Sequence, residues 1–296
     1  MNGIINIYKE AGYTSFDVVA KMRGILKIRK MGHTGTLDPD ATGVLPVCIG
    51  NGTKLVELFA DHEKEYIAEL KLGVATDTQD LSGEILKTSP VDVTCEEVTE
   101  AVMSFVGEYM QIPPMYSAVK VNGKKLYELA REGKEVERKA RPVCFREIEI
   151  LSMELPIVKI RVVCSKGTYI RTLCNDIGEK LGCYAAMKSL IRTKVGIFTL
   201  DQAITLEELE QYRDAGELAK VILSPDSIFM DLPAAYAKTE NCRFLDNGNA
   251  VYPNMLIKPP YFKDGEEVRM YGGEKFYGIY QFVAKDCKLK PVKMFL

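Results

Sequence analysis

The chain has 296 residues, 47% of them apolar and 27% charged, with a formal net charge of −2. This composition is typical of a globular protein, excludes a disordered or fibrous one, and leaves room for two domains. Its apolar runs are too short to span a membrane, and the first ten residues lack the features of a signal peptide, so we expect a cytoplasmic protein without membrane contact.

The N-terminal segment predicts a strand followed by a capped helix. Residues 4–8 are mostly apolar and indicate a short strand. Thr14 and Asp17 have the spacing of a capping box, so we expect a helix to begin after Thr14. Its apolar residues recur on one helical face: Val18, Val19, Met22, Ile25 and Leu26. A loop at 32–43 and a buried strand at 44–49 are predicted next.

The middle of the chain continues the mixture of strands and helices. Residues 66–72 alternate between apolar and polar, which is typical of a half-buried strand. Thr94 and Glu97 form a second capping box, and Gly107 is suited to follow the end of that helix. The Pro113-Pro114 pair predicts a break in regular structure before the next strand.

From residue 116 onward the pattern predicts two further helices and three strands. We expect strands at 116–121, 146–151 and 157–164, a short basic helix at 125–133 and a helix at 171–181. The elements follow no strict βαβ rhythm. The sequence therefore predicts an α+β fold with a mixed, largely antiparallel sheet and flanking helices.

The C-terminal part differs in texture from the rest. Short apolar segments there are separated by turn sequences at 246–248, 263–265 and 272–273, which indicates a small β-rich unit. Pro225 marks the expected linker. We therefore predict a domain over residues 1–228 and a second one over residues 229–296.

The net charge conceals a strong segregation of charge along the chain. Residues 21–30 carry five basic and no acidic residues, residues 120–146 carry nine against four, and residues 285–296 carry four against one. Any one of these runs fits a solvated helix surface. Three together favour a basic face that binds nucleic acid.

The segment from Gly32 to Pro46 has the composition of a rigid polar loop that presents a carboxylate. Its glycines permit close approach of backbone to a ligand, and Pro39 keeps Asp38 out of the helical region. An Asp-Pro pair is also a common turn, so composition alone leaves the role of Asp38 open.

The same segment resembles the signature of the pseudouridine synthases, and specifically of the bacterial tRNA pseudouridine synthase B family. The resemblance covers most of residues 1–195. It extends over residues 50–54, 64–66, 113–118, 122–131 and 167–172. It implies a pseudouridine synthase-like catalytic domain, and the C-terminal unit is similar in arrangement to a PUA-type RNA-binding domain.

The resemblance implies a tRNA substrate, held by its T arm and elbow, and isomerisation of the uridine at position 55 of the T loop. Asp38 matches the essential aspartate of the family, and Asp40 stands where the family pattern is variable, so we expect Asp40 on the surface. Arg171 matches the arginine that pairs with the aspartate. Whether Asp38 attacks the ribose or the base, or removes a ribose proton, is left open.

The remaining candidates follow from the expectation that the uridine is flipped out of the loop and held against aromatic rings. Tyr66 and Tyr169 match the two active-site tyrosines of the family, with Tyr66 stacked on the base. His33 matches the histidine at the flipped nucleotide, and Lys54 is a candidate phosphate contact. Taken alone, tyrosines on strands are more often half-buried core residues, and the lysine fits a helix surface nearly as well.

Isomerisation changes neither redox state nor phosphorylation, so we expect no cofactor. A transition-metal site is not expected either, because the eight cysteines show no C-x-x-C spacing and only two histidines are present. We expect a monomer that needs no protein partner.

Two other functions remain open from the sequence. The chain could act chiefly as an RNA-folding module, which needs the basic surface and aromatic rings but not the carboxylate. A phosphate-binding enzyme built on the loop at 32–43 is a weaker alternative, because the sequence has no G-x-x-x-x-G-K-[ST] motif.

Overall fold

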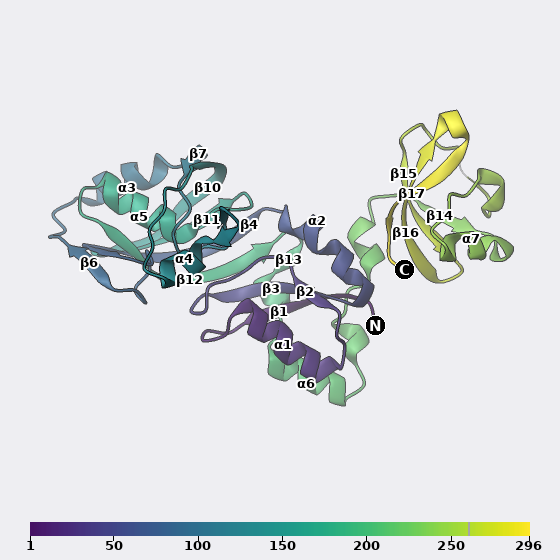
Figure 1. Ribbon diagram of the computed structural model, residues 1–296, viewed down its shortest axis with the longest axis horizontal. Helices are drawn as coiled ribbons and strands as arrows, with labels where there is room; N and C mark the ends of the chain where they lie inside the picture. The colour runs from purple at the N-terminus through teal and green to yellow at the C-terminus, as the bar shows by residue number, and fades with distance from the viewer. Residues whose placement is uncertain (260) are drawn as a thin grey trace.

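The computed structural model describes residues 1–259 and 261–296. Figure 1 shows a large lobe built on a nine-stranded sheet and a smaller lobe built on a four-stranded sheet. The strand pairs of the large sheet are antiparallel except for β12 with β3, which confirms the predicted α+β class with a largely antiparallel sheet. In spatial order its main strands are β1 (Gly3–Lys9), β3 (Thr42–Ile49), β12 (Ala185–Val195), β4 (Lys64–Leu72), β11 (Ile157–Cys164), β10 (Arg141–Glu154) and β7 (Gly107–Gln111).

The N-terminal half of the sheet is covered by α1 (Ser15–Leu26) and α6 (Leu206–Asp214). The predicted capping box begins α1, because Thr14 Oγ1 accepts from the Asp17 amide at 3.1 Å and Asp17 Oδ2 accepts from the Thr14 amide at 2.9 Å. The apolar face of α1 then packs on β1 and β3. Two short strands, β2 (Met31–His33) and β13 (Phe198–Thr199), pair with β3 and β12.

The other half of the sheet is covered by α3 (Cys95–Met103) and α5 (Ile170–Lys180). The second predicted capping box begins α3 at Thr94. Side chains of β4 are buried in alternation, as the sequence pattern predicted, because one face meets these helices while the other is partly solvated. Each half of the sheet therefore has its own apolar core.

The two halves join where β3 runs parallel to β12, over the register pairs Ile191 with Thr42 and Arg192 with Gly43. Gly43 has φ +104°, and a Cβ there would lie 2.2 Å from the Arg192 carbonyl oxygen. Only glycine permits this approach. The junction ends the loop that carries Asp38, so the loop lies at the seam between the cores.

Two sequence predictions need correction. Residues 116–118 form bends and residue 119 has no regular structure, in place of the predicted strand. Only β8 (Lys120–Val121) is extended, and it pairs with β9 (Lys124–Lys125) before α4 (Leu126–Arg131). The carbonyl of Tyr116 accepts from Arg171 instead of a strand partner. The predicted loop at 32–43 begins with β2, because Met31–His33 pairs with β3. A two-stranded hairpin of β5 (Val74–Thr76) and β6 (Ile85–Thr88) lies beside β12.

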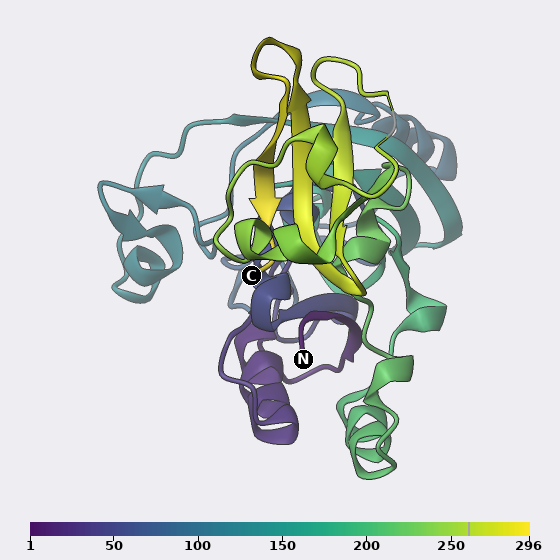
Figure 2. The same ribbon diagram turned by 90° about the vertical axis from the view of Figure 1, so that its right-hand side faces the viewer.

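The small lobe contains β14 (Ala234–Ala237), β15 (Glu267–Gly272), β16 (Lys275–Val283) and β17 (Lys288–Met294), with α7 (Cys242–Asp246) beside them. Figure 2 views the molecule from this lobe. Phe295, directly after β17, is buried in an apolar cluster with Phe59 and Phe198 of the large lobe. This shared cluster links the end of the chain to Phe59 on α2 (Val56–Ala60).

No helix within residues 1–259 or 261–296 has the length and apolar character needed to cross a membrane.

Candidate active site

The loop that connects β2 to β3 presents Asp38, and its backbone is anchored from β1 and α1. Ser15 Oγ accepts from the Leu37 amide at 2.9 Å. Lys9 Nζ donates to the carbonyls of Pro39 at 2.9 Å and Ala41 at 2.6 Å. These bonds fix the residues on both sides of Asp38, so the carboxylate is held rigidly.

Lys9 is fully buried, and its ammonium is satisfied by backbone carbonyls rather than by an ion pair. Burial lowers the pKa of Lys9 to about 8, against the opposing effect of Asp38 and Asp40. The sequence analysis did not single out Lys9, because a lysine at the end of a strand ordinarily points to solvent.

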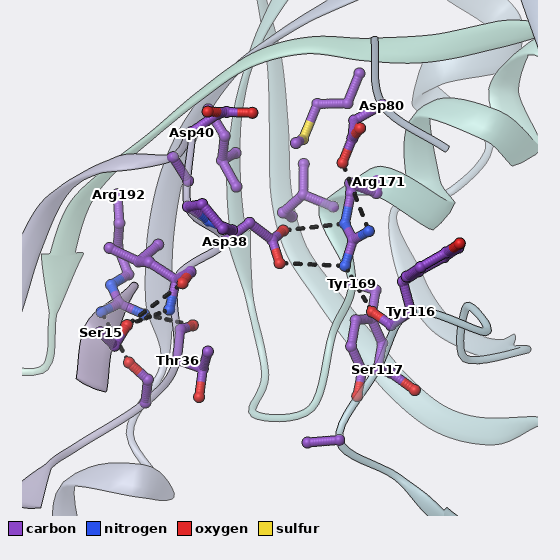
Figure 3. A pocket seen from close by; sticks show the side chains of 18 of the residues that line it. Ser15, Thr36, Asp38, Asp40, Asp80, Tyr116, Ser117, Tyr169, Arg171 and Arg192 are labelled. Atoms are coloured by element: carbon purple, nitrogen blue, oxygen red, sulfur yellow. Dashed lines mark hydrogen bonds and ion pairs between the residues drawn. The ribbon is translucent and has the colours of Figure 1, made fainter. Parts of the chain in front are cut away.

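Asp38 and Arg171 point toward each other across the cavity, as Figure 3 shows. Arg171 Nε lies 3.0 Å from Asp38 Oδ2, and Arg171 Nη2 lies 3.2 Å from Asp38 Oδ1, so the pairing is bidentate. Arg171 is 6% exposed and stands in the first turn of α5. The structure thus brings together two residues that are 133 positions apart in the chain.

The other donors of Arg171 are also occupied. Its Nη1 donates to the Thr78 carbonyl at 3.0 Å, and its Nη2 donates to the Tyr116 carbonyl at 2.9 Å. A second carboxylate, Asp80, lies 3.5 Å from Nη1. Asp80 was missed by the sequence analysis because it belongs to a turn whose only notable signal is its polarity.

The electrostatics of Asp38 reflect burial opposed by pairing. Burial raises the pKa of the Asp38 carboxyl above its ordinary value, Arg171 opposes that shift, and Asp80 adds to it. One guanidinium therefore serves two carboxylates. The arrangement can supply a partly desolvated carboxylate as a nucleophile or as a base.

Asp38 opens into a cavity of about 1130 Å³ that is lined by both halves of the large lobe. The cavity is also lined by Arg171, Tyr66, Tyr169, His33 and Asp40. It therefore brings together five of the six predicted site residues, and Asp40 lies among them. Asp40 is exposed on the rim, as expected. Within residues 1–259 and 261–296, no group of three or more His, Cys, Asp or Glu side chains is arranged to hold a metal ion.

The two tyrosines occupy different depths of the cavity. Tyr66, on β4, is 7% exposed, and burial raises the pKa of its hydroxyl, an effect that the positive charge of Arg192 partly offsets. Tyr169 precedes α5 and is half-buried, with its backbone amide and carbonyl both bonded to the Gln111 side chain. Burial is also the main cause of the raised pKa of the Tyr169 hydroxyl.

Arg192, on β12, is a site residue that the sequence analysis missed. It is 1% exposed, and its guanidinium donates to the carbonyls of Val44 at 2.7 Å and Gly35 at 3.2 Å. No carboxylate pairs with it in the described part of the chain. Arg192 therefore holds the start of the Asp38 loop and leaves positive charge under the cavity (Figure 3).

His33 and Lys54 differ in their placement. His33 ends β2 and lines the cavity, where burial and then Arg192 lower the pKa of its imidazole, so its neutral form is favoured. Its Nδ1 has no hydrogen-bond partner among the described residues. Lys54 is exposed outside the cavity, and its Nζ lies 3.4 Å from the Leu296 carbonyl.

Comparison with known proteins identifies the family of the chain. Residues 23–170 match the model of the TruB family pseudouridylate synthase N-terminal domain, and residues 171–230 match the tRNA pseudouridylate synthase B C-terminal domain. The chain is 52% identical to tRNA pseudouridine synthase B of Lachnoclostridium phytofermentans over the full length of both proteins. It is 47% identical to the enzyme of the same name from Alkaliphilus oremlandii, covering 99% of this chain and 97% of that one.

Among solved structures, the chain is similar to one titled as an H/ACA RNP bound to a substrate RNA containing 2′-deoxyuridine. The TM-score is 0.70 at 26% identity, covering 99% of this chain and 85% of the other. A Cbf5-Nop10-Gar1 complex contains a chain with the same TM-score at 28% identity. The family matches and the full-length relatives together establish that the chain belongs to the TruB family of tRNA pseudouridine synthases, enzymes that isomerise uridine to pseudouridine in tRNA.

Proposed function

We propose that the chain isomerises uridine 55 in the T loop of tRNA, with Asp38 as the catalytic carboxylate. The observation that carries the proposal is the bidentate pairing of Asp38 with buried Arg171 at the cavity. In the reaction the bond from ribose C1′ to uracil N1 breaks, C1′ bonds to C5, C5 loses its proton, and N1 takes up a proton. A carboxylate acting as nucleophile or base suffices for this exchange.

The proposal includes flipping of the uridine, because a base inside a folded loop cannot reach Asp38. Tyr66 forms the apolar surface for the flipped base, and Tyr169 bounds it from the α5 side. His33 lies against the vacated position in the loop. This assignment is supported by the shared cavity of the four residues and by the neutral imidazole that burial favours.

The experiment that tests the assignment of position 55 uses an unmodified tRNA transcript and a variant with cytidine at position 55. Purified protein is incubated with each RNA, and the nucleosides are analysed. Pseudouridine in the first RNA alone supports the assignment. Equal pseudouridine in both would place the target elsewhere in the tRNA.

Replacing Tyr66 tests the stacking role. Tyr66→Phe should keep much of the affinity for tRNA but lose turnover if, as we propose, the hydroxyl receives or relays the C5 proton. Tyr66→Leu should lose both, since stacking on a base is worth about 1–3 kcal/mol. Affinity and single-turnover rate are the measurements.

Tyr109→Phe is the matched control for Tyr66→Phe. It removes a tyrosine hydroxyl that bonds Asp176 at 3.0 Å outside the cavity, and it should leave turnover unchanged. Unchanged rates in both Tyr66 variants would return Tyr66 to a purely structural role.

We also propose that residues 229–296 form a PUA-like domain that aids tRNA binding, separate from a catalytic domain of residues 1–228. The support is the separate four-stranded sheet with its own apolar core. Lys285 and Lys293 carry no ion pair among the described residues, whereas Lys288 and Lys290 share Asp286 at 3.8 and 2.6 Å. The unpaired lysines are therefore the better phosphate contacts, and Lys54 lies beside Lys293 along a shared hollow.

Removing the charge of each lysine in turn should show which of them contact the phosphates of tRNA. Lys285→Gln and Lys293→Gln should each weaken tRNA affinity and make the slope of log affinity against log salt shallower by about 0.9 per lost duplex contact, with turnover at saturating tRNA little changed. Lys290→Gln should change the slope less, because Asp286 already compensates that charge. Deleting the domain is a poorer test, because it would uncover the cluster around Phe295. Unaltered slopes in all three variants would remove the PUA-like assignment.

A second candidate function, assistance of tRNA folding, is favoured by the basic runs at 21–30 and 120–146. It needs affinity but not Asp38, so a variant that lacks the carboxylate separates the two. We propose that the chain acts as a monomer without a protein partner. A tRNA substrate also favours the cytoplasm as its location.

A further inference from the structure

The largest side chain left uncovered at the cavity rim is Phe16, which is 65% exposed. It is the second residue of α1, and its neighbour Ser15 is bonded to the backbone of Leu37. The ring therefore stands one residue away from the anchored loop that presents Asp38. A single exposed phenylalanine is ordinary on a protein surface, but at the entrance to the cavity the exposed face of this ring is available to a ligand.

A second observation concerns Arg23, which lies seven residues, about two turns, after Phe16 in α1. Its guanidinium carbon lies 5.9 Å from the centre of the Phe16 ring. Its Nε is buried without a hydrogen-bond partner, and no carboxylate pairs with it in residues 1–259 and 261–296. The guanidinium is thus held over the ring, and without a carboxylate partner it can bind an anion through its outer Nη donors.

The two side chains have the chemistry that binds an unpaired nucleotide. An aromatic face accepts any base by stacking, and an adjacent guanidinium binds the phosphate of the same or the next nucleotide. A few residues along the same helix, Lys21 Nζ lies 4.2 Å from the ring centre of Tyr13. A second pair of a cation and an aromatic ring therefore lies at the start of α1, where Tyr13 precedes the helix.

We propose that Phe16 stacks on an unpaired base of the RNA loop other than the target uridine, and that Arg23 contacts the phosphate beside it. This inference rests on the proposed function, because it assigns a second nucleotide subsite to the same cavity. Phe16 has no hydrogen-bonding group, so the subsite accepts any base and contributes affinity and positioning rather than sequence readout.

The test is a cycle that combines protein variants with abasic RNAs. A T-arm stem–loop is made with an abasic residue at each loop position in turn except the target, and affinity is measured for the wild type, Phe16→Ser and Phe16→Trp. Phe16→Ser should weaken binding of the intact RNA about 5- to 150-fold, as expected for one stacked base, while Phe16→Trp should not. At one abasic position the loss caused by Phe16→Ser should disappear.

Met110→Ser is the matched control, because Met110 is 58% exposed on β7 outside the cavity and should show no loss with any RNA. Arg23→Gln should make the salt slope shallower by about 0.7, the value for a single-strand contact. Equal loss from Phe16→Ser with every abasic RNA, or no loss with the intact one, would overturn the subsite. Pseudouridine formation by the wild type in the same intact stem–loop is scored separately, so failure of the proposed reaction is distinguishable from failure of the subsite.

Discussion

Asp38→Asn should abolish pseudouridine formation while leaving the affinity for tRNA nearly unchanged. Asparagine keeps the size of the side chain and one acceptor for Arg171, but it lacks the charge needed for attack or proton removal. General acid–base catalysis raises a reaction rate by about 10²–10⁴-fold, and removing a nucleophile lowers the rate by more. We therefore expect the rate of pseudouridine formation to fall by at least about 10³-fold. Release of tritium from C5 of uridine measures it directly.

Asp40→Asn is the control for this experiment, because Asp40 lies on the same loop and the same cavity but is exposed. It should retain activity. Normal tritium release from Asp38→Asn, with affinity intact, would transfer the catalytic role to another group. If the inactive Asp38→Asn variant still assists tRNA folding, the two proposed functions coexist and are separable.

Arg171→Met should lose both turnover and stability. Without the guanidinium, no cation lies between Asp38 and Asp80, and the two carboxylates repel each other. The carbonyls of Thr78 and Tyr116 also lose their hydrogen-bond donor. Breaking a buried pair costs about 3–5 kcal/mol, and because both carboxylates keep some contact with water we expect the lower end, about 3 kcal/mol. Urea unfolding measures the stability, and single-turnover kinetics measure the rate.

Arg171→Lys distinguishes the charge from its geometry. An ammonium restores a cation but cannot bond both oxygens of Asp38 and two carbonyls in one plane, so stability should recover more than turnover. Arg161→Met is the matched control, because Arg161 on β11 binds Glu65, Glu147 and Glu149 outside the cavity. It should lower stability slightly without changing the rate at saturating tRNA. A rate for Arg171→Met equal to that of the wild type would contradict the assignment.

Local features of this protein were predictable from the sequence because they depend on neighbours in the chain. The capping boxes at Thr14 and Thr94 and the alternation along β4 need only residues a few positions apart. The resemblance also identified Asp38, Tyr66, Tyr169 and Arg171, which line one cavity, and their chemical roles remain proposals.

The sequence could not reveal what distant segments impose on each other. The strand β12 was not predicted, because its burial pattern is interrupted by two register shifts and lacks a clear alternation. Residues 116–119 do not form the predicted strand, because the Tyr116 carbonyl accepts a hydrogen bond from Arg171 rather than from a neighbouring strand.

The tertiary structure also decided which charged side chains belong to the site. Lys9, Asp80 and Arg192 are ordinary polar residues in sequence, and only their burial beside the Asp38 loop gives them a role. The sequence by itself determined the helices that begin at capping boxes, the β4 pattern and the loop with its carboxylate. Only the pairing of β3 with β12 brought that loop next to buried Arg192 and opposite buried Arg171. A charged side chain can be buried only where several partners bind it, and distant segments of the chain supply those partners.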